Sequence, residues 1–171
     1  DYFRAEAPEK YKIKGSFGHP VPVVDGKTQS SGAKASAIVL KKEFTDVKDL
    51  LCIDYTSAYS TPSLDKLVRT FVYDRQGKGS FTVGDEFTAN APIRFETAIT
   101  TQANWKIIDD THLLLTTGTE QMTVTIEASG KVAFTSETIE VNSPAYTRIG
   151  ISLKEQSKDG YIRLTMRTKQ L

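Results

Sequence analysis

Two histidines, His19 and His112, are the chain's only imidazole groups among 171 residues. His19 follows a glycine and precedes a proline, at the start of a short apolar stretch that ends in Asp25-Gly26. An imidazole in this position is a candidate metal ligand or a candidate contact to substrate. One histidine completes neither a metal site nor an acid–base pair, and a lone histidine is more often a hydrogen-bonded structural residue. Both roles are therefore open for His19.

Other residue types that could do chemistry have weaker contexts. Asp85 and Glu86 are adjacent carboxylates, but neighbours in a strand point to opposite faces, which predicts a solvent face and a turn rather than a catalytic pair. Asp109-Asp110 is predicted to form a hairpin turn. Cys52 is the single cysteine, so no internal disulfide forms, and its apolar neighbours predict a buried core thiol. No nucleophile elbow, phosphate loop, zinc-finger spacing or dinucleotide fingerprint is present in the sequence.

Charge and hydropathy exclude several classes of partner. The sequence has 22 basic and 21 acidic residues, so no strong field favours nucleic acid or an anionic membrane. No apolar run reaches the roughly 20 residues that span a bilayer, and no signal peptide is recognisable. The chain begins with Asp, which suggests a processed product or an excised domain. We expect a periplasmic or extracellular parent protein, with a cytoplasmic one also compatible.

The elements that must position these residues are predicted to be strands. Apolar residues alternate with polar ones at period two, as in Phe71 and Tyr73 or in Ile162, Leu164 and Met166. Turn signals separate about eleven or twelve such segments, starting near residues 20, 34, 50, 66, 80, 92, 104, 111, 120, 131, 146 and 160. This pattern predicts an all-β fold, an antiparallel β-sandwich. Residues 44–51 could form one short helical turn.

The sequence divides into two unequal parts. Residues 1–14 mix charge and aromatic side chains without a period, which predicts an N-terminal arm or a linker from a missing preceding domain. Residues 15–171 carry the predicted sandwich. Within it, Trp105 fits core or edge packing, with a sugar-stacking platform as the alternative. Tyr55, Tyr59 and Tyr73 are further candidate sugar contacts, although tyrosine is common in strands for its β-propensity alone.

Several segments, taken in order, resemble a known family. They are His19, Asp25-Gly26 with Gln29, the Asp54–Tyr59 segment of the form D-x-T-x-A-Y, the Arg69 strand, and the strand that closes in Asp85-Glu86-Phe87. This order is similar to that of the C-terminal β-sandwich domain of heparinase II/III-like polysaccharide lyases, over roughly residues 15 to 90. Phe95-Glu96-Thr97 and the 147–151 segment are less specific matches.

The resemblance implies more than this chain contains. Members of the family carry an N-terminal α/α toroid that supplies most catalytic residues, and they cleave uronate-containing polysaccharides by β-elimination. In members with a structural zinc, the histidine that matches His19 is one ligand, and the other ligands precede the matching region. Where the family often has Asn-Thr after this histidine, this chain has Pro20-Val21, and Pro20 removes a backbone donor.

These implications give a specific expectation and two rivals. We expect the domain to support the toroid, to line one side of the cleft near His19 and to be inactive alone. No catalytic residue is expected within it, and Asp54, Tyr55, Tyr59 and Arg69 are expected to serve packing and sheet-end hydrogen bonds. Zinc is expected only in the intact parent. The rivals are a stand-alone carbohydrate-binding module and a structural interaction sandwich.

Overall fold

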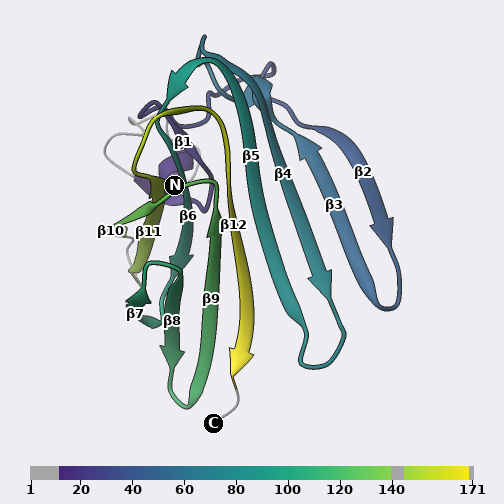
Figure 1. Ribbon diagram of the computed structural model, residues 1–171, viewed down its shortest axis with the longest axis vertical. Coiled ribbons are helices and arrows are strands. Elements are labelled where there is room, and N and C mark those ends of the chain that lie inside the picture. The colour runs from purple at the N-terminus through teal and green to yellow at the C-terminus, as the bar shows by residue number, and fades with distance from the viewer. Residues whose placement is uncertain (1–11, 140–144, 170–171) are drawn as a thin grey trace.

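Two antiparallel sheets dominate the computed structural model, which describes residues 12–139 and 145–169 (Figure 1). The smaller sheet has the strand order β1-β6-β11-β10, and the larger has the order β2-β3-β4-β5-β12-β9-β8-β7. The strands are β1 (Val23–Val24), β2 (Ile38–Phe44), β3 (Lys48–Asp54), β4 (Leu64–Asp74), β5 (Ser80–Ile93), β6 (Phe95–Thr101), β7 (Asn104–Asp109), β8 (His112–Thr117), β9 (Glu120–Ala128), β10 (Val132–Ile139), β11 (Tyr146–Leu153) and β12 (Ser157–Lys169). The predicted antiparallel β-sandwich is confirmed.

Three short 3₁₀ turns complete the described elements: η1 (Lys12–Lys14), η2 (Ser16–Gly18) and η3 (Thr56–Ala58). Most of the predicted arm, residues 1–11, lies outside the described residues. No helix in the part of the chain that the structure describes is long and apolar enough to cross a membrane.

The helical turn considered for residues 44–51 does not form. β2 ends at Phe44 and β3 begins at Lys48, so these residues contain a hairpin turn instead. Thr45 closes the turn, because its backbone N–H donates to the Lys48 carbonyl and its hydroxyl accepts from the Lys48 N–H at 2.9 Å. The turn's local polar residues fit a helix equally well, but the ladder with β4 fixes residues 48–54 as a strand.

The core lies between the two sheets and is built from the apolar half of each alternation. Phe87 of β5 stacks on Phe95 of β6 with ring centroids 4.6 Å apart. Leu67, Ile149 and Ile162 join them and are fully buried. Such buried aromatic and aliphatic contacts are the main favourable term in folding.

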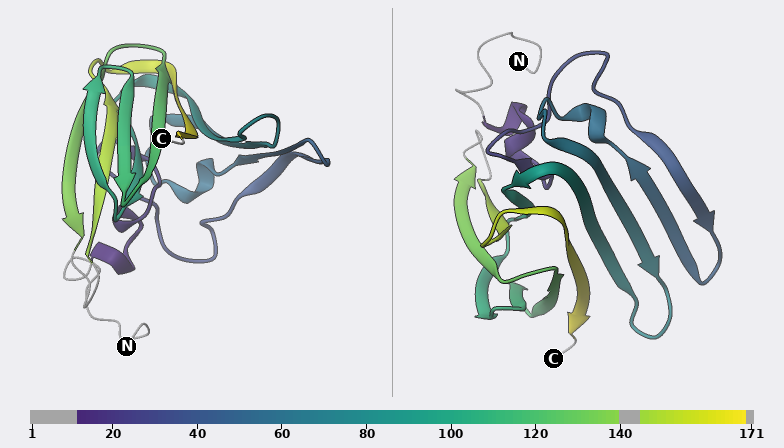
Figure 2. Two further views of the ribbon diagram at one scale, coloured as in Figure 1. Left: turned by 90° about the horizontal axis from the view of Figure 1, so that it is seen from below. Right: turned by 45° about the horizontal axis from the view of Figure 1, so that its top comes forward.

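The smaller sheet covers only part of the larger one. Strands β2 to β5 fan away from the two-layered part of the molecule (Figures 1 and 2). Exposure rises along β4 accordingly, from the fully buried Leu67 through the half-buried Phe71 to Tyr73, which is 45% exposed. We use the term wing for β2, β3, residues 71–74 of β4 and residues 80–83 of β5.

Two further sequence predictions have definite outcomes. Cys52 is half-buried rather than a core thiol, because it pairs with Thr70 on the outer face of the larger sheet, which the smaller sheet does not cover. Asp109 and Asp110 do lie at a hairpin turn, between β7 and β8. There Asp109 accepts hydrogen bonds from Thr111, and His112 lies 2.9 Å from the same carboxylate.

Candidate functional site

His19 lies exposed at the end of η2, on the segment that runs from η1 to β1. Its backbone is extended, with φ −112° and ψ 161°, and its N–H donates to the Ser16 carbonyl at 3.1 Å. Beside it is a cavity of about 370 Å³. The cavity is lined by Ile13, His19, Thr100, Thr101, Gln102 and Tyr146. The imidazole therefore stands at the edge of an open, mostly uncharged depression.

Side chains of the sandwich hold the backbone around His19 by hydrogen bonds. Three carbonyls, at alternate positions on either side of His19, each accept a hydrogen bond from a side chain that belongs to a different part of the fold. The pairs are Tyr146 to Gly18 at 2.6 Å, Arg69 to Pro20 at 2.8 Å and Tyr59 to Pro22 at 2.8 Å. Because Pro20 and Pro22 have no N–H, these carbonyls are the hydrogen-bonding groups their backbone offers. The sandwich thus fixes the path of the His19 segment.

The contact between Arg69 and the Pro20 carbonyl depends on a buried ion pair. Arg69 and Asp85 lie directly opposite each other on β4 and β5 and bond twice, Nε to Oδ1 at 2.7 Å and Nη2 to Oδ2 at 2.8 Å. The Asp85 carboxylate also accepts from the Tyr55 hydroxyl and the Thr97 hydroxyl, each at 2.7 Å. Four donors match the acceptor capacity of a carboxylate, which is what makes this burial tolerable.

The placement of Asp85 corrects a sequence prediction. The Asp85-Glu86 pair was predicted on a solvent face and turn, but Asp85 is 1% exposed and lies in the middle of β5. Its neighbour Glu86 is exposed, so the two carboxylates do point to opposite faces. The side of β5 that Asp85 occupies is the side that the smaller sheet covers, and Arg69 supplies the compensating charge.

Burial and charge shift the proton affinity of the groups around this pair. Burial first, and then the Asp85 carboxylate, raise the pKa of Tyr55 far above its ordinary value of 10.0. Burial likewise raises the pKa of Tyr59, even though the nearby Arg69 charge opposes the rise. Burial alone would lower the pKa of Arg69, but the charge and hydrogen bonds of Asp85 raise it. Both tyrosines are therefore neutral donors and Arg69 is a fixed cation at physiological pH.

The D-x-T-x-A-Y segment folds into the turn that delivers the two tyrosines. Asp54 accepts from the Thr56 N–H at 3.0 Å and from the Thr56 hydroxyl at 2.7 Å. The Thr56 hydroxyl accepts in turn from the Leu67 N–H at 2.8 Å, which ties η3 to β4. Tyr55 and Tyr59 then meet edge to face, with centroids 5.8 Å apart. Asp54, Tyr55, Tyr59 and Arg69 thus all take part in packing and hydrogen bonds of the sandwich.

A second buried arginine lies under the His19 segment on the outer face of the smaller sheet. Arg148 of β11 is 2% exposed and bonds Glu96 of β6 at 2.7 Å. Phe17 of η2 covers it, with the guanidinium carbon 4.4 Å from the ring centroid. Sequence reasoning missed this layer because alternation with Ile149 places Arg148 on the side opposite the core. Nothing in the sequence pattern shows that η2 lies across that side.

The described residues do not fit a complete zinc site. Structural zinc takes four nitrogen, sulfur or carboxylate ligands, yet His19 shares its cavity with threonine, glutamine and tyrosine side chains. No group of three His, Cys, Asp or Glu residues is placed to hold a metal within residues 12–139 and 145–169. That His19 binds zinc in an intact parent stays a prediction.

Trp105 is half-buried on β7 and packs against the core.

Gly18 gives a test of how the His19 segment is held. A Cβ at Gly18 would lie 2.4 Å from the Lys12 carbonyl oxygen and 2.9 Å from the Ile13 Cα, both of them backbone atoms. Gly18→Ala is therefore expected to separate η2 from η1 and to lower the free energy of unfolding by about 1–3 kcal/mol. Urea unfolding followed by tryptophan fluorescence measures the change. Gly84→Ala is the matched control, because its Cβ would meet only ordinary contacts at 3.7 Å. Equal effects of the two changes would contradict the close packing at Gly18.

The fold of this chain is similar to part of several solved structures. No family model and no curated protein matches this sequence. Among solved structures, heparinase III matches with a TM-score of 0.73 and 16% identity, over 98% of this chain and 26% of that chain. The heparinase III product of BT4657 matches with a TM-score of 0.72 and 13% identity, over 98% of this chain and 26% of its own.

A third structure, the heparan sulfate lyase HepC from Pedobacter heparinus, matches with a TM-score of 0.73 and 13% identity, over 95% of this chain and 25% of that chain. The chain thus spans about a quarter of the length of the lyase structures that it matches. At such identities the likeness is one of fold. The chain folds as a β-sandwich found within heparinase III and heparan sulfate lyase structures.

Proposed function

We propose that this chain is the β-sandwich domain of a polysaccharide lyase, which supports a catalytic α/α toroid and lines one side of the substrate cleft with His19. The proposed substrates are uronate-containing polysaccharides of the heparan sulfate or alginate kind. The observation that carries the proposal is the rigid mounting of His19, an exposed imidazole whose flanking carbonyls are anchored by Tyr146, Arg69 and Tyr59. Such anchoring is typical of a residue whose position matters to a partner or substrate.

The chemistry assigns separate tasks to the two parts of such an enzyme. In β-elimination a base removes the proton beside the uronate carboxylate, a positive or hydrogen-bonding group stabilises the developing charge, and an acid protonates the leaving oxygen. Among the residues that line the cavity, His19 supplies the imidazole, a side chain that can serve as an acid, a base or a hydrogen-bond donor in such chemistry. The toroid of the parent would supply the remaining groups.

The surroundings of His19 fit a supporting role in that cleft. Its cavity offers hydroxyl and amide groups from Thr100, Thr101, Gln102 and Tyr146, which suit hydrogen bonds to sugar hydroxyls. In the intact parent, zinc would take His19 as one ligand and would need its other ligands from outside the described residues. A polysaccharide substrate fits a periplasmic or extracellular parent.

The chain's two histidines provide a matched test. In the intact polypeptide, His19→Ala is expected to lower kcat/KM for lyase cleavage by about 100-fold or more, because a proton-transfer or charge-positioning group is lost. His112→Ala is expected to leave the activity unchanged, because His112 lies at the β7–β8 turn beside Asp109. The ultraviolet absorbance of the unsaturated uronate product measures both variants on heparan sulfate and on alginate.

Three outcomes would count against the proposal. Wild-type activity in His19→Ala would remove His19 from the cleft. Formation of unsaturated product by the 171-residue chain alone would show that the toroid is not needed for the chemistry. An intact polypeptide that is inert toward every uronate polysaccharide but retains sugar affinity would favour the carbohydrate-binding alternative.

A further inference from the structure

The inner face of the wing, the side on which the smaller sheet packs farther along the strands, is mainly apolar and uncovered. Its apolar side chains include Val39, Phe44, Leu51, Phe71, Tyr73 and Phe81, and the strand register adds two charged ones, Lys42 opposite Leu51 and Asp49 opposite Tyr73. Phe44 is 63% exposed, Tyr73 is 45% exposed and Phe81 is 38% exposed. Phe71 and Phe81 stack with centroids 6.4 Å apart, so the aromatic rings form a continuous surface.

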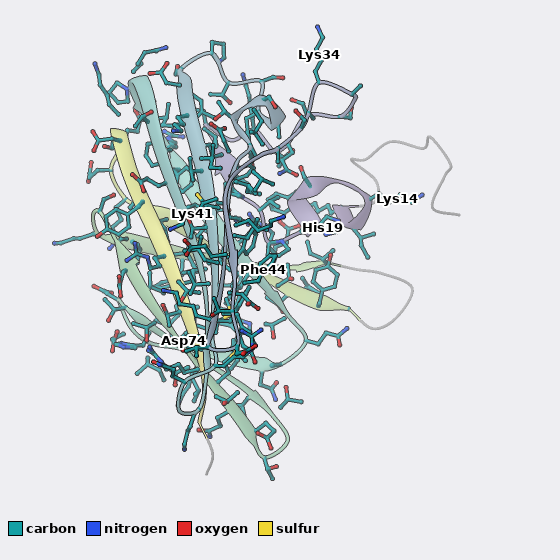
Figure 3. The ribbon with its side chains drawn as sticks, turned by 90° about the vertical axis from the view of Figure 1, so that its right-hand side faces the viewer. Lys14, His19, Lys34, Lys41, Phe44 and Asp74 are labelled. Carbon is teal, nitrogen blue, oxygen red and sulfur yellow. The ribbon has the colours of Figure 1, made fainter. Side chains whose placement is uncertain are left out.

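The strand register places these side chains on one face. Leu51 pairs with Phe71, and Tyr73 pairs with Phe81, and directly paired residues project to the same side of a sheet. Phe71 is two residues beyond Arg69, whose side chain is buried under the smaller sheet. The wing's inner face therefore continues the core face. Figure 3 looks at the edge of the wing and shows Phe44 on the side where His19 lies, with Lys41 on the other side.

An uncovered apolar sheet face of this kind marks a contact surface. A sheet buries its hydrophobic face against a second layer, and here the second layer ends before the wing does (Figure 2). Contiguous exposed apolar patches on soluble proteins mark interaction sites. The outer face of the wing is more mixed, since Leu50 and Val72 lie there beside Thr82 and a Lys41–Glu43 ion pair at 3.0 Å.

We propose that the inner face of the wing is the docking surface for the helical domain of the same polypeptide, an inference that rests on the function proposed above. Arg69 links the two regions directly, because its neighbour on the wing is Phe71 and its guanidinium holds the Pro20 carbonyl beside His19. A domain that reaches the His19 cavity from this side also meets the wing. The lyase structures matched by this chain are about four times its length, so each contains ample chain for such a partner.

The chemistry of the face favours a protein surface over a polyanionic sugar chain. The cation nearest its aromatic rings, Arg75, lies 4.8 Å from the Tyr73 centroid and is neutralised by Asp49, with Nη2 and Oδ2 2.5 Å apart. Lys42 is the other cation that the register places on this face of the described strands, and one lysine among apolar side chains is a poor match for a polyanion. The four strands, at about 4.8 Å spacing, give the wing a width of roughly 14 Å, and at about 3.3 Å rise its length is roughly 13 Å along β4 and β5 and 23 Å along β2 and β3. One helix of about 10–12 Å diameter fits that footprint.

Hydroxyl-radical footprinting read by mass spectrometry tests the proposal, because two side chains on opposite faces of the sheet have nearly equal exposure. Phe81 is 38% exposed on the inner face, and Tyr161 is 39% exposed on the outer face of the neighbouring strand. In the 171-residue chain alone, Phe44, Tyr73 and Phe81 are expected to oxidise readily. In the intact polypeptide, their oxidation is expected to fall at least fivefold, while oxidation of Tyr161 stays the same.

Variants in the intact polypeptide provide the second reading. The double change Tyr73→Ser and Phe81→Ser is expected to restore oxidation at Phe44 and to increase proteolytic cleavage between the domains by about tenfold. Tyr161→Ser is the control and is expected to do neither. If the proposed lyase activity fails while the wing is protected, the docking surface stands and the function does not.

Other occupants of the face would be recognised by the same probe. Equal oxidation of Phe81 in both proteins would overturn the docking proposal, whatever the lyase activity. Protection of Phe81 in the chain alone, together with a dimeric mass in sedimentation, would assign the face to a second copy. Protection of Tyr73 in the chain alone by added heparan sulfate oligosaccharide would assign it to sugar. Each of these results would overturn the inference.

Discussion

Asp85→Leu is expected to lower the free energy of unfolding by about 3–5 kcal/mol, because it leaves the buried Arg69 guanidinium without its counter-ion. Arg69 is 6% exposed and Asp85 is 1% exposed, so water cannot replace the lost carboxylate. Tyr55 and Thr97 lose an acceptor at the same time. An unpaired buried donor carries its own desolvation penalty, which adds to the cost of the unpaired charge.

Two comparison variants separate this effect from a general loss of charge. Glu127→Leu removes one partner of the exposed Arg163 pair and is expected to cost less than about 1 kcal/mol. The double variant Arg69→Met with Asp85→Leu is expected to be more stable than Asp85→Leu alone, because no buried charge remains. Urea unfolding at neutral pH measures all three variants. Equal costs for Asp85→Leu and Glu127→Leu would show that the buried pair does not hold the sandwich together.

The same variant links stability to the candidate site. Without Asp85, the Arg69 side chain has no fixed direction, and its hydrogen bond to the Pro20 carbonyl depends on that direction. The His19 segment then retains the Tyr146 and Tyr59 contacts and loses the central one. Hydrogen exchange of the Val21 amide, which bonds the His19 carbonyl at 2.8 Å, reports this local loosening before global unfolding.

Much of the sandwich could be predicted because period-two alternation directly reflects strand geometry. Predicted strand starts near 104, 120 and 146 agree with β7, β9 and β11. The same alternation could also have predicted the burial of Asp85. It lies two residues from Val83 and two from Phe87, so alternation places this carboxylate on the apolar face of β5. Arg69 lies in the same way between Leu67 and Phe71, and the two departures from the pattern pair with each other.

The arrangement of the site itself could not be predicted from local pattern. The Tyr146 hydroxyl reaches the Gly18 carbonyl across 128 positions of sequence, and no turn or periodicity encodes that contact. The assignment of strands to two sheets of unequal size also depends on long-range pairing. The uncovered wing follows from that assignment, since alternation alone makes Tyr73 and Phe81 look like core residues. The family resemblance joined the segments in order but could not show that they converge on the His19 backbone.

Alkaline pH is expected to destabilise the protein through the two tyrosines that support this site. The folded-state pKa values of Tyr55 and Tyr59 lie above the ordinary value of 10.0, mainly because both side chains are buried. Above about pH 10 the unfolded chain therefore loses protons that the folded protein keeps. Their contribution to stability is fully present below pH 10 and is lost as the pH rises toward the folded-state pKa values, with a slope of up to about 1.4 kcal/mol per pH unit for each tyrosine.

Tyr59→Phe isolates one of these contributions. At neutral pH the variant is expected to lose about 1 kcal/mol, because the Pro22 carbonyl loses its donor. Above pH 10 the free energy of unfolding of this variant is expected to fall less steeply with pH than that of the wild type, by the slope that one proton contributes. In the double variant Tyr55→Phe with Tyr59→Phe, the slope is expected to be reduced by the contribution of about two protons. Urea unfolding at pH 9 to 12, with tyrosinate absorbance counting the protons released on unfolding, measures both slopes. Identical slopes in the wild type and the double variant would mean that these hydroxyls ionise within the folded protein, and that the carbonyls beside His19 are not held by buried neutral donors.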